Sequence, residues 1–289
     1  GPFRRSTYET LSASSNYIAL SLTRNKWQTL QRLRPMGLPT LYSGIAASEQ
    51  AAVALAKQIG HAVVLKPLDG AKGRGVSLNL TSEEQVRKAY RLAAAEGSNV
   101  LVESFAIGDD YRLLAVEGKL IAAAKRLPAQ VFGDGQRTIA QLIEVINADP
   151  RRGTDYEKLL EKIQIDARML DILARQAMTI ETVPATGAVV RLSLAANISQ
   201  GGTAVDVIDA VHPDVREAAE RTAKAIGLEV LGIDYLTTDI AKSWRDVGGW
   251  FLEVNAPPGL RPHWIANPDQ DVVTPLVRQK SSASMPSEV

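Results

Sequence analysis

Oxygen-bearing side chains recur in the last third of the sequence with a spacing that suits a metal site. Glu253 and Asn255 lie two residues apart in the strand-like run GWFLEVNA, and Asp234 lies in the earlier run GIDYL. Because side chains of a strand alternate between its two faces, Glu253 and Asn255 share one face and the apolar residues beside them take the other. Mg²⁺ prefers such oxygen ligands together with nucleotide phosphates. The pattern predicts a magnesium and nucleotide site, with a solvated edge strand as the alternative.

A glycine-rich loop is the second candidate for chemistry, in the segment VVLKPLDGAKGRGVSLNL. Gly70, Gly73 and Gly75 lie between two predicted strands, and Lys66 ends the first of them. Glycines let backbone N–H groups approach an anion closely, and a lysine adds a positive charge beside them. The spacing is neither a Rossmann fingerprint nor a Walker A motif. It is compatible with a phosphate-binding hairpin loop and equally with a tight, solvated turn.

The elements that must position these residues follow from periodicity and from cap residues. We expect a folded part over about 17–278, with flexible arms over 1–16 and 279–289. Helices are predicted over 49–59, 83–95, 138–147, 156–178 and 214–226, and strands over 61–67, 77–80, 99–104, 188–196, 228–236 and 249–256. A hairpin over 111–126 turns at Glu117-Gly118. Mixed helices and hairpins favour α+β lobes over a doubly wound parallel sheet.

Composition excludes several classes of function. The chain has 289 residues, no cysteine and three histidines, so disulfides, thiolate zinc sites, iron–sulfur clusters and cysteine nucleophiles are absent. A net charge of +1 argues against an extended nucleic-acid surface. No apolar run approaches the ~20 residues that cross a bilayer. We therefore expect a cytoplasmic protein with neither nucleic acid nor membrane as a partner.

Six segments together carry a combination of motifs that is far more specific than any one of them. They are KPLDGAKGRGVSLNLT, LVESFAIGDDYRLLAVEGKLIAAAKR, GDGQRTIAQLIEVINADPRRG, NISQGGTAVDVIDAVHPDV, GIDYLTTDI and GGWFLEVNAPPGLRPH. In this order, over about residues 20–275, the chain resembles the ATP-grasp domain of cyanophycin synthetases and, less completely, bifunctional glutathione synthetases.

The resemblance implies an ATP-grasp fold in which two α+β lobes clamp ATP. Residues 17–105 would form the N-terminal lobe, and residues 106–278 the C-terminal lobe with the metal site and a helical insertion over 127–180. The implied reaction joins a carboxylate and an amine of amino acids or short peptides through an acyl phosphate and releases ADP and phosphate. ATP and two Mg²⁺ ions would take part, and a homo-oligomer is compatible with the family.

The resemblance also implies roles for single residues. Those that would bind ATP are Lys26, Lys66, Gly70, Gly73, Gly75, Glu103, Ser104, Phe105 and Asp110, with the last near the ribose. Those that would bind Mg²⁺ are Asp234, Glu253 and Asn255. Those that would act on the transferring phosphoryl group are Arg126 and Arg261. Those that would face the substrate are Asn197, Ser199, Gly201, Gly202 and His263.

Some questions stay open at this level. The DPRRG run is either a solvated cluster or a grip on an anionic substrate through Arg151 and Arg152. Pro262 stands where the family leads us to expect Met. From the length of 289 residues we expect the chain to lack the Mur-ligase-like half of a full cyanophycin synthetase, either as an excised fragment or as a solitary ligase. A glutathione-type dipeptide ligase is an alternative within the same chemistry. A nucleotide-binding module without catalysis is the alternative outside it.

Overall fold

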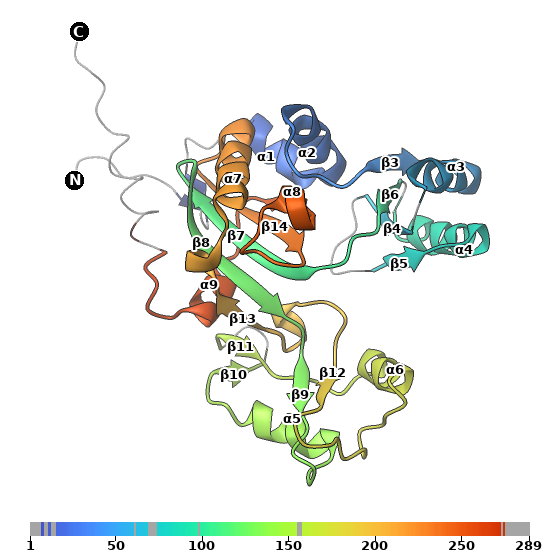
Figure 1. Cartoon of the computed structure of the whole chain (residues 1–289), viewed down its shortest axis with the longest axis vertical. Coiled ribbons are helices and arrows are strands. Elements are labelled where there is room, and N and C mark those ends of the chain that lie inside the picture. Colours follow the sequence, from blue (N-terminus) through green and yellow to red (C-terminus); the bar gives the residue numbers. More distant parts are fainter. Residues whose placement is uncertain are drawn as a thin grey trace.

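The computed structural model of the chain describes residues 7–8, 11–12, 16–60, 62–68, 74–97, 99–154, 158–272 and 274. Two antiparallel sheets and a smaller insertion make up this part of the chain (Figure 1). A four-stranded sheet with two helices lies at one side, a five-stranded sheet with its covering helices lies in the middle, and the insertion extends from the end of the long hairpin. The predicted α+β class is confirmed.

The four-stranded sheet has the order β3-β6-β4-β5, and each neighbouring pair is antiparallel. Its strands are β3 (Ser43–Ala46), β4 (Val63–Pro67), β5 (Ser77–Leu80) and β6 (Val100–Ser104). Helices α3 (Glu49–Ile59) and α4 (Glu83–Ala94) pack with it, and Leu65 and Val102 lie in the shared apolar core. Because strand side chains alternate, Lys66 and Glu103 lie on the face turned away from the helices.

Local signals set the ends of these two helices. The Ser48 hydroxyl accepts a hydrogen bond at the start of α3, and Gly60 ends the helix with a left-handed φ of 77°, as predicted. Ser82 and Gln85 form a capping box at the start of α4. The helix boundaries therefore follow from short-range hydrogen bonds that are visible in the sequence.

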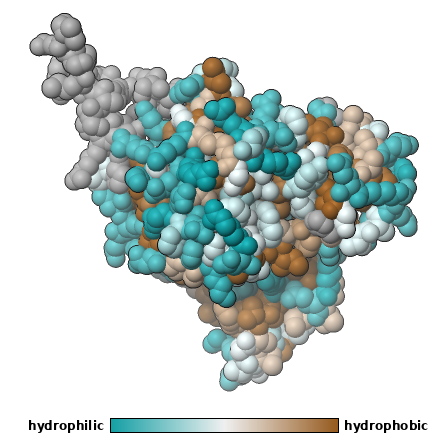
Figure 2. All heavy atoms as spheres, turned by 45° about the horizontal axis from the view of Figure 1, so that its top comes forward, coloured by the Kyte–Doolittle hydropathy of each residue, from teal (hydrophilic) through white to brown (hydrophobic). Residues whose placement is uncertain are grey.

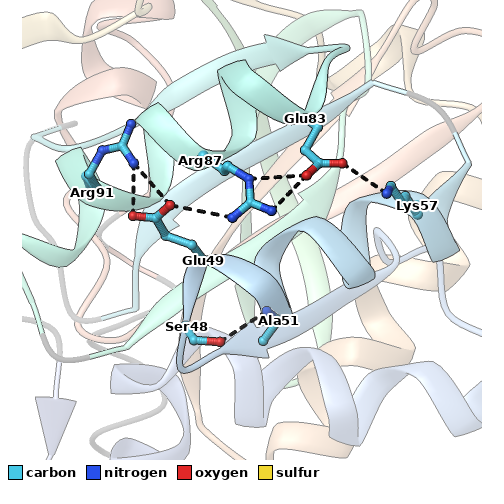
Figure 3. A network of polar contacts seen from close by, with 7 residues as sticks. All are labelled: Ser48, Glu49, Ala51, Lys57, Glu83, Arg87 and Arg91. Atoms are coloured by element: carbon cyan, nitrogen blue, oxygen red, sulfur yellow. Dashed lines mark hydrogen bonds and ion pairs between the residues drawn. The ribbon is translucent and has the colours of Figure 1, made fainter.

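An ion-pair network joins α3 to α4 (Figure 3). Glu49 lies 2.9 Å from Arg91 and 3.7 Å from Arg87, which also lies 2.7 Å from Glu83. Glu83 in turn lies 3.0 Å from Lys57. Exposed ion pairs contribute about 0–1 kcal/mol each. The network therefore orients the two helices rather than supplying most of the stability of this layer.

The five-stranded sheet has the order β13-β8-β7-β14-β15, again with antiparallel neighbours. Its strands are β7 (Asp109–Val116), β8 (Lys119–Leu127), β13 (Thr203–Asp206), β14 (Val230–Thr237) and β15 (Gly249–Asn255). The predicted turn joins β7 to β8, with positive φ at both Glu117 (50°) and Gly118 (73°). A glycine at the second position fits such a turn because it adopts positive φ at no steric cost.

Three helices cover one face of this sheet. Helix α7 (Pro213–Ile226) begins one residue before the predicted start and ends at Gly227, whose φ is 75°. Helices α1 (Tyr17–Arg24) and α2 (Lys26–Leu33) lie beside it, and Leu33 is fully buried in the same core. Residues 17–33 were expected in the N-terminal lobe but pack on the five-stranded sheet, because that surface buries their apolar stripe.

The insertion between β8 and β13 is mixed rather than helical. Its elements are β9 (Gln130–Phe132), α5 (Ile139–Asn147), β10 (Arg152–Gly153), β11 (Leu160–Glu161), α6 (Ala167–Arg175) and β12 (Val189–Arg191). The helix predicted over 156–178 and the strand predicted over 188–196 are therefore too long. The physical reason is that residues 160–161 pair with β10, and β12 pairs with β9 over three residues only.

Short elements complete the described part. They are β1 (Thr7–Tyr8), β2 (Leu11–Ser12), α8 (Trp244–Val247), α9 (Arg261–Ala266) and the 3₁₀ turns η1 (Arg34–Met36), η2 (Ile198–Gln200) and η3 (Ile208–Ala210). Strands β1 and β2 pair within the predicted N-terminal arm, whose other residues up to 15 lie outside the described ones, as does the tail 279–289.

Among the described residues, every helix is too short or too polar to span a bilayer. On the face in Figure 2, apolar residues form scattered groups between polar ones rather than a continuous band.

Candidate active site

Three adjacent strands of the five-stranded sheet place charged side chains on the face opposite α7. Tyr111 and Tyr235 lie in the α7 core, so Asp110 and Asp234 point to the other face. Arg126 is the cross-strand partner of Asp110 and donates to its Oδ1 from Nε (2.8 Å) and Nη2 (2.5 Å). The same Nη2 lies 3.0 Å from Asp234 Oδ2. One guanidinium therefore bridges two carboxylates from different strands.

Arg112 is a member of this face that sequence reasoning missed. It lies opposite Asp234 in the β7–β14 register, and its Nε is 3.1 Å from Asp234 Oδ1. Gly232 leaves room for it, since a Cβ there would lie 2.9 Å from Arg112 Nη1. The signal was present in the run DDYR, where the arginine follows Asp110 by two residues and so shares its face.

The edge strand β15 adds the oxygen donors that the sequence pattern singled out. Glu253 lies opposite Asp234 in the β14–β15 register, and Asn255 Nδ2 is 3.4 Å from Asp234 Oδ1. Lys26, the first residue of α2, places its Nζ 3.3 Å from Glu253 Oε2. The structure thus brings Asp234, Glu253 and Asn255 together, and it adds Lys26 from a distant part of the chain.

The pKa values of Asp110 and Arg126 are both raised, for different reasons. Burial raises the pKa of the Asp110 carboxyl, and the positive charge of Arg126 opposes this shift without cancelling it. Burial acts to lower the pKa of Arg126, but Asp234 and Asp110 outweigh it and the net shift is upward. Arg126 is therefore a fixed positive charge on this face of the sheet.

The four-stranded sheet contributes a second charged pair. Lys66 Nζ and Glu103 Oε2 form a close ion pair between β4 and β6, with side chains that are 16% and 3% exposed. The other oxygen of Glu103 is buried and has no hydrogen-bond partner in the part of the chain that the structure describes. A buried acceptor of this kind is costly unless a ligand or water meets it.

Residues 103–105, the hinge, lie where the chain leaves the four-stranded sheet for the five-stranded sheet. Ser104 Oγ accepts a hydrogen bond from the backbone N–H of Tyr42 at 3.1 Å, and the N–H of Phe105 donates to Ala62 at 2.8 Å. Residues 105–108 then lead into β7. The end of β6 is therefore hydrogen-bonded to the segments that precede β3 and β4.

Part of the glycine loop lies outside the described residues. Gly70 and Gly73 belong to that part, whereas Gly75 is described. Its φ of 66° is left-handed, and a Cβ there would lie 3.0 Å from Pro67 Cγ. A glycine is thus required where the loop rejoins β5.

The residues expected near the substrate lie at the base of the insertion. Arg261 Nη1 is 3.1 Å from Glu161 Oε1. Asn197 and Ser199 line a cavity of about 640 Å³ between α6 and the segment 192–200. Gly201 and Gly202 follow in the same loop and pack closely against Ile163 and Leu127.

His263 was expected to touch the substrate, but the structure buries it. Its side chain is 1% exposed, because α9 packs against β8 and β13. Burial lowers its pKa to about 3, with Arg112 and Arg126 adding to the shift. The ring is therefore neutral and enclosed in this arrangement.

The donor set fits Mg²⁺ better than a transition metal. In the described residues there is no group of three or more His, Cys, Asp or Glu side chains that could hold a metal ion. Two carboxylates and one amide oxygen on adjacent strands are instead the partial ligand set that Mg²⁺ takes together with phosphates and water.

Comparison with known proteins assigns the fold. A family model described as an ATP-grasp domain matches residues 21–104. The crystal structure of a bifunctional glutathione synthetase from Pasteurella multocida superposes with a TM-score of 0.73 and 26% identity, over 95% of this chain and 38% of that one. The chain has the ATP-grasp fold.

Sequence relatives agree with this assignment. The ATP-grasp chain is 38% identical to a cyanophycin synthetase of Crocosphaera subtropica, over all of this chain and 34% of that protein. It is 30% identical to a glutathione biosynthesis bifunctional protein of Mannheimia succiniciproducens, over 88% of this chain and 34% of that one. The chain therefore spans about a third of the length of these curated relatives.

Proposed function

We propose that this ATP-grasp chain catalyses the ATP-dependent joining of a carboxylate to an amine, on amino acids or short peptides, through an acyl phosphate. The observation that carries the proposal is the face of the five-stranded sheet where Arg112 and Arg126 alternate with carboxylates, together with Lys26 of α2, which pairs with Glu253 at the sheet edge. The names of the relatives, a cyanophycin synthetase and a glutathione biosynthesis protein, support amide-bond formation. We place the activity in the cytoplasm.

The basic residues supply the charge that phosphoryl transfer needs. Lys26 and Lys66 bind phosphate oxygens of ATP, and Arg126 and Arg261 neutralise the oxygens of the transferring group. Asp110 Oδ1 already accepts from Arg126 Nε at 2.8 Å and from Nη2 at 2.5 Å, so the guanidinium needs little reorganisation when charge develops. Phosphoryl transfer depends mainly on such positioning and neutralisation rather than on a nucleophilic side chain.

The oxygen donors would hold the metal. Asp234, Glu253 and Asn255 are the proposed ligands of two Mg²⁺ ions. Bound Mg²⁺ would supply charge neutralisation of the nucleotide phosphates.

The hinge would receive the nucleoside. We assign Glu103, Ser104 and Phe105 to the adenine side and Asp110 to the ribose. Both hydrogen bonds from Arg126 to Asp110 use Oδ1, so among the described residues Oδ2 remains for a hydroxyl group. Gly70, Gly73 and Gly75 are proposed to cover the phosphates, and Asn197, Ser199, Gly201 and Gly202 to face the substrate.

A phosphate-release screen tests the proposal. ATP and Mg²⁺ are offered with pairs of amino acids and short peptides, and products are identified by mass spectrometry. We expect ADP and phosphate only when both a carboxylate and an amine are present. Glu253→Gln should abolish turnover, whereas Glu144→Gln, on the exposed side of α5, should leave it unchanged.

Two other results would reject parts of this assignment. Turnover that survives Glu253→Gln would remove this residue from the metal site. ATP binding by calorimetry without turnover for any pair would favour a nucleotide-binding module without catalysis. Sedimentation of the same sample would test for a homo-oligomer.

A further inference from the structure

The segment 160–163 at the base of the insertion is held rigidly by its neighbours. Its amides at residues 160 and 162 donate to the carbonyls of Arg151 and Gly153, each at 2.9 Å. The Asn147 side chain, at the end of α5, exchanges two hydrogen bonds of 2.8 Å with the backbone of Ile163. Three parts of the insertion thus fix one short stretch of backbone.

Arg152 connects this rigid stretch to the loop 197–202. Its Nη1 donates to the carbonyl of Glu161 at 2.6 Å and to the carbonyl of Gly201 at 3.1 Å. Arg151, its neighbour in the DPRRG run, instead points outward with a 59% exposed side chain and pairs with Asp149 at 2.7 Å. The two arginines of this run therefore have different surroundings, and Arg152 is the one bonded to backbone carbonyls.

The loop itself is seated closely on the same base. A Cβ at Gly201 would lie 2.5 Å from Ile163 Cγ1, and one at Gly202 would lie 2.8 Å from the carbonyl oxygen of Leu127. The lack of a side chain thus leaves room for the Ile163 side chain at Gly201 and for the Leu127 backbone at Gly202. The position of the loop is therefore set by residues 161–163 and by the end of β8.

The same base also holds Arg261. Glu161 Oε1 forms an ion pair with Arg261 Nη1 at 3.1 Å. Arg261 Nη2 also donates to the backbone carbonyl of Lys158. The carboxylate of Glu161 is 10% exposed, so solvent screens this pair only weakly. Residues 158–163 thus contact both the loop, through Ile163, and Arg261, through Glu161 and Lys158.

We propose that Arg152 is a positioning residue that holds the loop 197–202 and, through Glu161, Arg261 in the geometry used by the substrate. The insertion then supports the loop 197–202 and Arg261 and does not itself bind an anionic substrate. The changes in KM and kcat that this inference predicts rest on the proposed function. The predicted effect on the loop 197–202 does not depend on any activity.

Hydrogen exchange of the ligand-free protein tests the structural part. The amides of Gln200, Gly201 and Gly202 are hydrogen-bonded within the loop, so their exchange reports its opening. Arg152→Met keeps the apolar stem but removes both donors, and we expect exchange about tenfold faster at these amides. Arg151→Met is the matched control and should change them less than about twofold.

Steady-state kinetics distinguishes a positioning role of Arg152 from direct contact with the substrate and from a general loss of structure. In Arg152→Met, the KM for the carboxylate substrate should rise and kcat should fall, while the KM for ATP stays constant. Arg152→Lys, which can still donate to both carbonyls, should recover most of the exchange protection and most of kcat. Arg151→Met should behave as the unchanged protein.

Two results would overturn the inference. Equal exchange in the Arg152→Met and Arg151→Met proteins would show that the loop does not depend on Arg152. A raised KM with unchanged exchange would show that Arg152 contacts the substrate directly. If the unchanged chain turns over no substrate, the proposed function fails, while the exchange experiment still decides the positioning role.

Discussion

Replacing His263 should change how the stability of the protein depends on pH. The imidazole is 1% exposed, and both ring nitrogens lack a hydrogen-bond partner among the described residues. Burial lowers its pKa from 6.5 to about 3, the charges of Arg112 and Arg126 add to this shift, and Asp206 opposes it. The folded protein therefore binds a proton at His263 only at a much lower pH than the unfolded chain does.

The sign and size of the effect follow from linkage. Between pH 6.5 and pH 3 the unfolded state binds the proton and the folded state does not, so the free energy of unfolding falls as the pH falls. Each pH unit in this window costs about 1.4 kcal/mol. From pH 7 to pH 5, His263 alone should remove about 2 kcal/mol, and this loss should be absent when the side chain cannot titrate.

Urea unfolding followed by tryptophan fluorescence measures this difference, since Trp264 is the next residue in α9. The unchanged protein, His263→Gln and His263→Leu are compared at pH 7 and pH 5. Both variants lose the titration but differ in polarity, so both should have a pH dependence about 2 kcal/mol smaller than the unchanged protein. Parallel pH profiles for all three proteins would refute the reasoning, because they would mean that the ring is solvated in the folded state.

Three further predictions concern folding around the site. Lys66→Met should destabilise the protein by about 3 kcal/mol in urea unfolding, because it leaves the 3% exposed carboxylate of Glu103 unpaired. Adding Glu103→Leu should restore most of the loss. A single variant as stable as the double variant would contradict this prediction. Gly202→Ala should lower the free energy of unfolding by about 1–3 kcal/mol, since its Cβ would lie 2.8 Å from two backbone oxygens. In the control Gly259→Ala the new Cβ meets nothing within 4 Å, so the free energy of unfolding should change by less than about 0.5 kcal/mol. Ser82→Ala should cost about 1 kcal/mol through the lost capping box of α4, and an unchanged melting temperature would argue against that cap.

Elements with signals in their own sequence were predictable. The helix from Glu49 to Ile59 was correct to the residue, because its serine cap and its terminal glycine both act over a few residues. The helix predicted over 156–178 was wrong over its first part for the opposite reason. Residues 160–163 take their backbone partners from positions 147, 151 and 153, and no periodicity within the segment records those contacts.

The candidate site was likewise predictable only where the signal lies within one strand. Strand alternation placed Glu253 and Asn255 on one face, and the structure has them beside Asp234. Alternation does not give the register between strands, so it could not pair Arg112 with Asp234 or Arg126 with Asp110. Those pairings depend on how five strands from distant parts of the chain align, which is a tertiary property.

The pairing of these charges suggests how one face can serve two kinds of ligand. In the structure Lys26 binds Glu253, and Arg126 binds Asp110 and Asp234. Our proposal gives Lys26 and Arg126 to phosphate, and Glu253 and Asp234 to Mg²⁺. Asp110 is assigned to the ribose instead. Without ligands, the residues neutralise one another and avoid the cost of leaving part-buried charges unpaired. On this proposal, ATP and metal would replace the contacts of Lys26 with Glu253 and of Arg126 with Asp234, while Asp110 would keep the guanidinium of Arg126 in place.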